Sequence, residues 1–341
     1  MLKDIAIVIL NWNGQHFLEK FLPNVLRYSG EASVYLADNN STDNSVSFVS
    51  NNFPEVKIIL NKSNGGFAKG YNDALKEISS PFYLLLNSDI EVTENWLLPL
   101  LEIMKDDSVA GCQPKVLSYS QRDTFEHAGA SGGYLDRNYY PFCRGRILEM
   151  FEKDFGQYNG KAEIFWATGA ALLIRSDIFH KVDGFDESFF AHMEEIDLCW
   201  RIKKAGYKFM VEPKSTIYHV GGGTLAYNSP RKLFLNFRNS LFMLVKNHEG
   251  WLFPKLFYRL ILDGVAGFHF LVKGEFRSVI SVLNAHFNLY QRLPYLLKQR
   301  KEIKQSATLS NNHGIYKASI LWARYFKGIR KFSDLNQRFF Q

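Results

Sequence analysis

An apolar run, FYLLL at 82–86, leads directly into Asn87, Ser88 and Asp89, and Glu91 follows one residue later. A turn that only reverses the chain would use Gly, Pro, Asn or Asp for their backbone angles. Two carboxylates one residue apart, beside small polar side chains, suggest a further purpose. Mg²⁺ and Mn²⁺ prefer carboxylate oxygens and are often shared with substrate phosphates. The segment therefore favours a divalent cation over a solvated turn.

A second acidic cluster lies in the stretch HMEEIDLCWR, where Glu194, Glu195 and Asp197 begin a helix expected over 194–205. Acids at the start of a helix stabilise its dipole, and this is the simpler explanation. Three acids in four residues exceed that need, and their repulsion raises at least one pKa. A carboxylate tuned in this way suits a general base that acts on a hydroxyl. The spacing does not decide which of the three would be the base.

His219 stands between the apolar residues TIY and the glycine-rich segment VGGGT. A histidine near a strand end is often structural. A glycine loop behind it would also allow backbone amides to approach a phosphate. Both interpretations stay open, and the second depends on the cation.

The elements that must position these residues are short. The sequence predicts strands over 5–10, 33–37, 56–60 and 82–86, alternating with helices over 15–28, 43–51 and 67–78. A helix near 94–106 and a strand over 109–117 continue the pattern. Strands and helices alternating in this way predict a parallel sheet covered on both faces. Ligands of such sheets bind beyond the carboxyl ends of the strands.

Polar residues gather at those predicted carboxyl ends. The candidates are Asn11 and Asn13 after the first strand, Asp38 and Asn40 after the second, Asn64, Gly66 and Asn72 after the third, and Asn87, Ser88 and Asp89 after the fourth. Taken alone, the Asp38 loop could simply cap the next helix. The stretch NGGFAKGYN is neither a dinucleotide fingerprint nor a P-loop, but it precedes a helix whose N-terminus could face an anion.

Composition divides the chain of 341 residues into two parts. Residues 1–230 carry 22 basic and 29 acidic side chains, a net charge of −7, whereas residues 231–341 carry 19 and 5, a net charge of +14. Such asymmetry predicts different partners for the two parts. Three scattered cysteines exclude a disulfide framework or a zinc site and fit a reducing compartment. Residues 118–163 show little periodicity and are expected to be irregular and partly β.

Seven segments, taken together, resemble the family 2 glycosyltransferases, and most closely their bacterial rhamnosyltransferase-like branch, over residues 4–225. They are IVILNWN, ADNNSTDNS, NGGFAKGYN, LLLNSDIEV, GAALLIRSDIF, VDGFDESFFAHMEEIDLCWRI and YHVGGGT. The resemblance implies a GT-A fold, which is an α/β class with a Rossmann-like mixed sheet flanked by helices. It also implies a nucleotide-sugar donor, a divalent metal (Mg²⁺ or Mn²⁺) and inversion at the anomeric carbon. We expect a catalytic domain over 1–230, with a nucleotide-binding half (1–117) and an acceptor half (118–230), and a helical extension over 231–341.

The resemblance also implies residue roles. Asp38 would contact the nucleotide base, while Asn64, Gly66 and Asn72 would lie near the donor. Asp89 matches the last acid of the family's metal motif, which reads Asn87-Ser88-Asp89 here. Because the first acid of that motif is missing, metal affinity would rest on Asp89 and His219. The family's Glu-Asp base motif reads Glu194-Glu195, so Glu195 is expected to be the base, with Glu194 and Asp197 as competitors.

The expected function is transfer of rhamnose or another hexose from a nucleoside-diphosphate sugar to a glycan or a lipid-linked glycan in cell-surface polysaccharide synthesis. A sugar-1-phosphate nucleotidyltransferase and a non-catalytic nucleotide-sugar or glycan-binding protein are the alternatives. Nucleic acid is not an expected partner, because the acidic part would repel its phosphates. We expect a cytoplasmic enzyme on the inner face of the membrane. Residues 231–341 would bind anionic lipid there or, alternatively, form a homodimer.

Overall fold

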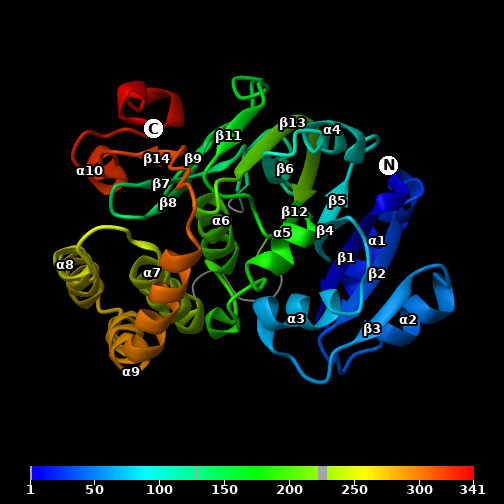
Figure 1. Ribbon diagram of the computed structural model, residues 1–341, viewed down its shortest axis with the longest axis horizontal. Helices are drawn as coiled ribbons and strands as arrows, with labels where there is room; N and C mark the ends of the chain where they lie inside the picture. Colours follow the sequence, from blue (N-terminus) through cyan, green and yellow to red (C-terminus); the bar gives the residue numbers. More distant parts are fainter. Residues whose placement is uncertain (1, 127–128, 222–228) are drawn as a thin grey trace.

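The computed structural model describes residues 2–126, 129–221 and 229–341. Within them, a nine-stranded mixed sheet has the strand order β11-β13-β6-β12-β4-β1-β2-β3, and β5 pairs with β13. Helices lie on both of its faces (Figure 1). Its strands are β1 (Ile5–Asn11), β2 (Ser33–Asp38), β3 (Lys57–Leu60), β4 (Phe82–Asn87), β5 (Ile90–Val92), β6 (Val109–Ser118), β11 (Ala162–Ile164), β12 (Ala171–Arg175) and β13 (Lys208–His219).

The alternation predicted for the first hundred residues is confirmed. Strands β1 to β4 are parallel to one another where they pair, while β12 runs antiparallel between β4 and β6 and makes the sheet mixed. The α-helices are α1 (Gln15–Tyr28), α2 (Ser45–Asn52), α3 (Gly66–Leu75), α4 (Leu97–Ile103), α5 (Ser176–Lys181), α6 (Glu194–Lys204), α7 (Pro230–Asn247), α8 (Leu252–Val272), α9 (Phe276–Ser306) and α10 (Ile320–Tyr325). Short 3₁₀ turns are η1 (Leu2–Asp4), η2 (Glu187–Phe189), η3 (Phe332–Asp334) and η4 (Gln337–Phe339).

The central strands are apolar at nearly every position because both faces of the sheet are buried. In β1, Ile5, Ile7 and Ile9 belong to one hydrophobic core, and the intervening Ala6 and Val8 belong to the other. Side chains alternate between the two faces of a strand, so a doubly covered strand needs apolar residues in succession. This burial fixes the register of the strands and hence the level at which their carboxyl ends stand.

A second, smaller sheet accounts for the segment that lacked periodicity. Its order is β10-β9-β8-β7-β14. Its strands are β7 (Gly133–Asp136), β8 (Pro141–Cys143), β9 (Arg146–Ile147), β10 (Met150–Phe151) and β14 (Ile315–Tyr316). Because β14 pairs in parallel with β7, the C-terminal segment closes a sheet that residues 133–151 begin.

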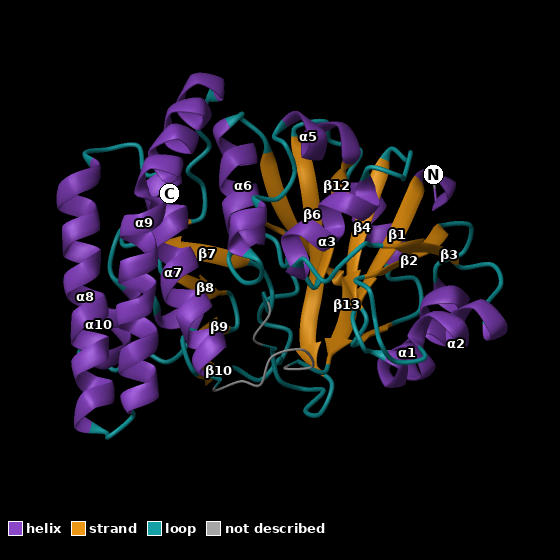
Figure 2. Cartoon of the chain, turned by 90° about the horizontal axis from the view of Figure 1, so that it is seen from below, coloured by secondary structure: helices purple, strands orange, loops and turns teal. Residues whose placement is uncertain are grey.

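The basic segment after residue 230 joins the same core. In α7, Leu241, Phe242 and Leu244 are buried with Ile196 and Trp200 of α6 in one cluster. Figure 2 shows α7, α8 and α9 as a layer of long helices beside the sheets, with α8 outermost. No helix among the described residues is long and apolar enough to cross a membrane.

Candidate active site

The ends of β1, β2 and β4 stand level at one edge of the main sheet. Asn11 is in register with Asp38, and Leu10 is in register with Asn87. The neighbouring antiparallel strand begins here, because the Asn87 backbone N–H donates to the Ala170 carbonyl (3.0 Å). The sheet therefore brings together the polar loops that the sequence places at strand ends.

Asp38 is 1% exposed, and its carboxylate is occupied by the neighbouring loops. It accepts hydrogen bonds from the Asn11 amide (2.9 Å), the Ser41 backbone N–H (2.8 Å) and the Ser41 hydroxyl (2.6 Å). A carboxylate has about four lone-pair positions, so most of them are filled. The predicted contact between Asp38 and a nucleotide base stays a prediction, and it would have to use the remaining lone-pair position. Asp38 holds the loops after β1 and β2 together.

The loop residues around Asp38 face outward. Asn13 and Asn40 have φ of 50° and 59°, a left-handed conformation that Asn adopts more readily than most residues. Asn13 Oδ1 accepts from the Thr42 backbone N–H (2.7 Å), whereas the Asn40 side chain is exposed. Asn11 Oδ1 is buried without a partner among the described residues, and a side chain at Gly14 would stand 2.4 Å from it. Asn11 therefore keeps one buried acceptor without a partner among the described residues, and Asn40 is open to solvent.

The start of α3 does not leave free amides for an anion, contrary to the sequence prediction. The Phe67 N–H donates to the Phe190 carbonyl (2.7 Å), and the Gly66 N–H donates to Asn64 Oδ1 (3.0 Å). Gly66 has φ of 80°, and a side chain there would collide with the Phe190 carbonyl. The glycine is required because the backbone at Phe190 approaches so closely.

The Asn72 side chain likewise makes hydrogen bonds within the protein, and its predicted place near the donor stays a prediction. The residue lies within α3, and its side-chain amide exchanges two hydrogen bonds with the Phe185 backbone, at 2.8 and 3.0 Å. Asn72 and the α3 amides thus fasten this helix to residues 185–190, the segment that leads into α6.

Asn87 and Ser88 are half-buried, and their side chains make no hydrogen bond to another described residue. They follow β4 and lead into Asp89, which is buried. Glu91 points to a different partner, since it pairs with Arg122 at 2.9 Å. The two acids of this segment therefore do not share one cation, and Asp89 is the one at the site.

Asp89, His219 and Glu126 form a buried chain of ionisable groups. Asp89 Oδ1 lies 3.2 Å from His219 Nε2, and Glu126 Oε2 lies 2.9 Å from His219 Nδ1. Burial would lower the pKa of His219, but the two carboxylates raise it to about 10. Burial would raise the pKa of Asp89, but the charge and hydrogen bond of His219 hold it below its ordinary value. Gly222, Gly223 and Thr224 of the predicted glycine loop lie outside the described residues.

The Asp89–His219 pair has the separation expected of two ligands of one metal ion. Ligands about 2.1 Å from an octahedral ion, at right angles to each other, stand about 3.0 Å apart. A bound ion would have to replace the Nε2 proton of the His219 imidazolium, whose pKa is raised to about 10. With Nδ1–H donating to Glu126, the Nε2 lone pair would then be available to the ion, as metal-binding histidines require. No group of three His, Cys, Asp or Glu side chains suited to a metal occurs in the described part of the chain. Asp89 and His219 could therefore supply two ligands to a divalent ion, and its remaining ligands would have to come from water and substrate.

Glu194 and Glu195, at the start of α6, have no cationic partner among the described residues. Each has an Oε2 atom with no hydrogen-bond partner among the described residues. Burial raises the pKa of Glu195 to about 7, and burial together with the charge of Glu195 raises the pKa of Glu194 well above its ordinary value. Glu194 is 4% exposed, whereas Glu195 is partly exposed. Glu195 is thus the more accessible of the pair.

Glu195 stands next to the end of β4. A Cβ atom built on Gly169 would lie 3.5 Å from the Cβ of Glu195 and 2.9 Å from the ring of Phe67. Gly169 immediately precedes Ala170, whose carbonyl accepts from the Asn87 N–H. The base candidate and the Asn87-Ser88-Asp89 segment therefore lie on the same edge of the sheet.

The surroundings of Asp197 do not suit the role of general base. Its side chain is fully buried and lies 2.9 Å from both Arg201 Nε and Lys246 Nζ. The Asn247 amide donates to its other oxygen (2.7 Å). A fully buried carboxylate enclosed by two cations has no access to a substrate hydroxyl, so Asp197 serves the packing of α7 on α6.

The comparison with known proteins agrees with this geometry. The model of "Glycosyl transferase family 2" matches residues 6–182, more than half of the chain. The chain belongs to this family. The glycosyltransferase is 22% identical over 298 residues to the N-acetylglucosaminyl-diphospho-decaprenol L-rhamnosyltransferase of Mycobacterium tuberculosis, covering 80% of this chain and 94% of that protein.

Solved structures confirm the GT-A-like fold of the glycosyltransferase. GalNAc-T7 with UDP, GalNAc and Mn²⁺ matches with a TM-score of 0.55 and 15% identity over 71% of this chain, which spans 47% of that chain. The mannosyltransferase PcManGT of Pyrobaculum calidifontis, in complex with GDP-Man and Mn²⁺, matches with a TM-score of 0.50 and 14% identity, covering 89% of this chain and 86% of that one. At these identities the likeness concerns the fold.

Sequence reasoning missed three side chains that shape the site of the glycosyltransferase. Glu126 lies in the segment without periodicity, where nothing marked it as a partner of His219. Arg238 and Asn239 of α7 donate to the backbone carbonyls of Ser188, Phe189, Ala191 and His192. These bonds fix the segment before Glu194 from a helix some 45 residues later, a contact that has no local sequence signal.

Proposed function

We propose that this glycosyltransferase transfers a hexose, with rhamnose as the first candidate, from a nucleoside-diphosphate sugar to a hydroxyl of a lipid-linked glycan. The product would serve cell-surface polysaccharide synthesis. The observation that carries the proposal is Glu195, a partly exposed residue whose carboxylate keeps a buried Oε2 without a partner among the described residues and whose pKa burial raises to about 7. The similarity to a rhamnosyltransferase over 94% of that protein supports the choice of sugar and acceptor.

Glu195 acts as the general base in this proposal. Its carboxylate takes the proton of the acceptor hydroxyl while that oxygen forms a bond to the anomeric carbon. The bond from that carbon to the diphosphate oxygen breaks, and its electron pair leaves with the nucleoside diphosphate. Attack from the face opposite the leaving group inverts the anomeric carbon. A base with a pKa near the working pH is best matched to this proton transfer.

Asp89 and His219 would hold a divalent ion, Mg²⁺ or Mn²⁺, and Glu126 would orient the imidazole. Two solved GT-A relatives contain Mn²⁺, which supports this assignment. When bound, the ion neutralises charge on the diphosphate. The half-buried Asn87 and Ser88 side chains lie beside Asp89 and are proposed to contact the donor.

The nucleotide is proposed to lie over the loops that Asp38 organises. Asn11 Oδ1, at the end of β1, is a buried acceptor without a partner among the described residues, and Asn40, in the loop after β2, is exposed. We propose them beside Asp38 as contacts of the base. A membrane-anchored acceptor would place the enzyme in the cytoplasm, at the inner face of the membrane.

A donor panel tests the proposal directly. The full-length protein is incubated with dTDP-rhamnose, UDP-hexoses or GDP-mannose, with Mn²⁺ or Mg²⁺ and a short-chain prenyl-diphosphate N-acetylglucosamine acceptor. One donor should raise the melting temperature in a metal-dependent manner, because ligands that bind the folded state stabilise it. The same donor should yield a glycosylated acceptor with inverted configuration. A donor that binds without being consumed would indicate a non-catalytic binding protein, and release of pyrophosphate from a nucleoside triphosphate would indicate a nucleotidyltransferase.

A further inference from the structure

Helix α8 exposes a long apolar stripe, while its inward face combines buried polar residues with Leu252, Leu256 and Leu260, which pack on the core. Its fully buried residues are Arg259, Asp263 and Gly267. Its outward stripe is apolar, and the side chains in it are between 48% and 78% exposed: Phe253, Phe257, Ile261, Val265, Phe268 and Val272. A surface helix in water normally turns its apolar stripe inward. The outer face of α8 is therefore suited to an apolar surrounding.

Buried polar contacts fix α8 in this orientation. Arg259 donates to the Ser240 hydroxyl (2.7 Å) and to the Asn138 carbonyl (3.2 Å), and it pairs with Asp263 at 3.2 Å. Its guanidinium also lies 3.7 Å from the centre of the Tyr140 ring. Rotating α8 to hide its apolar stripe would break these contacts and leave buried charges unpaired, which is strongly unfavourable. The apolar stripe must therefore remain outside.

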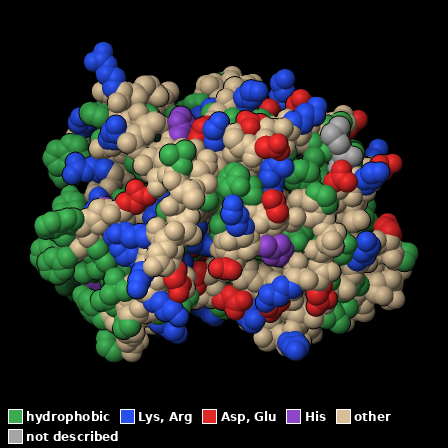
Figure 3. Space-filling view, in the orientation of Figure 1, with side chains coloured by type: hydrophobic (Ala, Val, Ile, Leu, Met, Phe, Trp, Pro, Cys, Tyr) green, Lys and Arg blue, Asp and Glu red, His purple; other side chains and the backbone are tan. Residues whose placement is uncertain are grey.

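The apolar face continues onto α9. Its outward residues, 55% to 64% exposed, are Phe276, Ile280, Leu283, Phe287 and Tyr290. Figure 3 shows hydrophobic side chains gathered at the end of the molecule where α8 and α9 lie. The five phenylalanines of this α8–α9 face, each more than half exposed, present on the order of 500 Å² at about 200 Å² per side chain. With the other six side chains the face exceeds the largest patch of a typical monomer, about 300–600 Å².

The charges around the α8–α9 face favour an anionic surface over a second copy of the chain. Between residues 252 and 298 the acids are Asp263, which is buried against Arg259, and Glu275. The exposed basic residues of this stretch are Lys273, Arg277, Arg292 and Lys298. A second copy would bring like charges together, whereas lipid phosphates would attract them.

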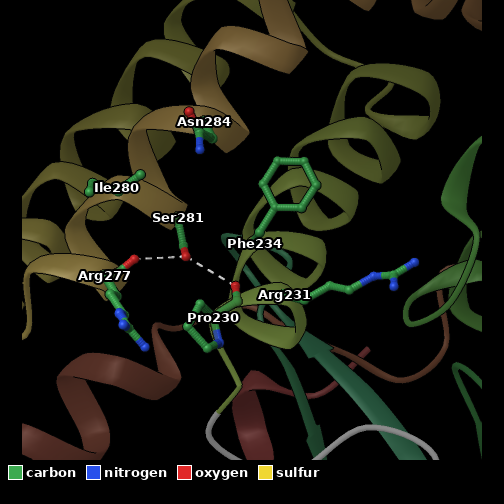
Figure 4. A pocket seen from close by; sticks show the side chains of 7 residues that line it. All are labelled: Pro230, Arg231, Phe234, Arg277, Ile280, Ser281 and Asn284. Atoms are coloured by element: carbon green, nitrogen blue, oxygen red, sulfur yellow. Dashed lines mark hydrogen bonds between the residues drawn. The ribbon is translucent and has the colours of Figure 1, made fainter.

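The inner rim of this face leads toward the active site. A pocket of about 300 Å³ lies between α7 and α9, with the apolar residues Phe234 and Ile280 in its lining. Figure 4 shows Arg231 and Arg277 directed to opposite sides of it, so their charges lie along its rim. The guanidinium of Arg231 lies 4.9 Å from the centre of the Phe190 ring, and the Phe190 carbonyl caps α3. Arg231 therefore connects the rim of the pocket to Phe190, in the segment before Glu195.

We propose that the α8–α9 face lies in the interfacial region of an anionic bilayer, with the basic rim at the level of the lipid phosphates. Amphipathic helices with apolar and basic faces bind membranes in this way. The inference rests on the proposed function where it concerns the acceptor: docking would bring a lipid-linked hydroxyl to the Glu195 side of the sheet. The docking itself is independent of catalysis.

Vesicle co-sedimentation of the full chain tests the proposal. We expect binding to phosphatidylcholine vesicles with 30% phosphatidylglycerol, and binding several-fold weaker without the anionic lipid or at high salt. The triple change Phe257→Ser, Val265→Ser and Phe268→Ser should reduce binding at least tenfold. Its matched control, Leu60→Ser with Phe155→Ser, removes apolar side chains that are 63% and 85% exposed elsewhere and should change nothing. Lys273→Gln with Arg277→Gln should abolish the preference for anionic vesicles.

Two outcomes overturn the proposal. The first is that the wild-type chain co-sediments with neither type of vesicle. The other is a dimer by light scattering that the triple change converts to a monomer without any effect on vesicle binding, which would assign the face to a second copy. Transfer to a water-soluble acceptor, measured on the same variants, should remain at the wild-type level. If the wild-type chain transferred sugar but did not bind vesicles, the docking proposal would fail and the proposed function would stand. If it bound vesicles but transferred no sugar, the proposed function would fail and the docking proposal would stand.

Discussion

The two sides of the candidate site differ in how their carboxylates are paired. On the side proposed for the nucleotide, the Asp38 carboxylate accepts hydrogen bonds from Asn11 and Ser41, and one unpartnered acceptor, Asn11 Oδ1, lies beside it. On the side of α6, Glu194 and Glu195 keep oxygens without partners among the described residues. A satisfied buried polar group gives rigidity and shape, whereas an unsatisfied one costs free energy of folding. On the side of α6, the unpartnered carboxylate oxygens therefore lower the stability of the fold. A catalytic role for this pair would explain why they are present.

The contrast also holds within one helix. Glu195 and Asp197 are two residues apart in α6, yet two cations and an amide surround Asp197 while none reaches the free oxygen of Glu195. A carboxylate thus serves packing at Asp197 and keeps an oxygen without a partner at Glu195. The distinction comes from α7, which supplies Lys246 and Asn247 to Asp197. Each variant below tests one side of this contrast.

The largest effect is expected at Asp89. Asp89→Ala removes one of the two proposed metal ligands and should lower turnover by about three orders of magnitude or more. The fold should persist, because the residue lies at a strand end. Glu91→Ala is the matched control: its pairing with the exposed Arg122 is worth little. Turnover at controlled Mn²⁺ and circular dichroism measure both. Wild-type turnover of Asp89→Ala at a chelator-buffered Mg²⁺ level would refute the metal assignment.

An intermediate effect is expected at Glu195. Glu195→Gln keeps the shape of the side chain and should lower kcat by about two to four orders of magnitude, with little change in KM for the donor. Asp197→Asn should instead lower stability by about 3–5 kcal/mol, because it leaves buried Arg201 without its counter-ion and removes one of the two carboxylates that pair with Lys246. Rates per folded molecule and denaturant midpoints separate the two. Normal turnover in Glu195→Gln together with an inactive but folded Asp197→Asn would transfer the role of base to Asp197.

The sequence predicted the sheet well where periodicity was strong. Doubly buried strands such as β1 and β4 carry long apolar runs, and the amphipathic pattern of α1 was found at its true bounds, Gln15–Tyr28. The strands β7 to β10 have between two and four residues each, too few for alternation to be recognised. The pairing of β14 with β7 joins segments about 180 residues apart, which local pattern cannot predict.

The sequence predicted which residue types gather at the site but not which of them are free. Asp38 and Asp89 both follow strands, and the difference between them lies in their partners, Ser41 in one case and His219 in the other. The partner of His219 on its far side, Glu126, comes from a segment without periodicity. Partners at long sequence separation decide the electrostatics, so the roles of Glu194, Glu195 and Asp197 needed the three-dimensional structure.

The smallest effect is on thermal stability, and its sign should differ between the two sides. The pKa of Glu195 is about 7 in the folded protein and about 4.5 in the unfolded chain. Between these values the folded state binds more protons, so stability falls as the pH rises through that window and the loss persists above it. Glu195→Gln stays neutral at every pH. It should leave the melting temperature almost unchanged at pH 5 and raise it by a few degrees at pH 8.

Asp38→Asn supplies the opposite case, because it weakens the acceptor of the Ser41 N–H and hydroxyl. A buried donor that loses a charged acceptor costs about 1–3 kcal/mol, so the melting temperature should fall at both pH 5 and pH 8. Differential scanning fluorimetry of the two variants beside the wild type measures both shifts. If Glu195→Gln shifted the melting temperature equally at the two pH values, ionisation of Glu195 would not be the cause. If Asp38→Asn were as stable as the wild type, Asp38 would not be the organiser of the nucleotide-side loops, and its direct contact with the base would again be the better explanation.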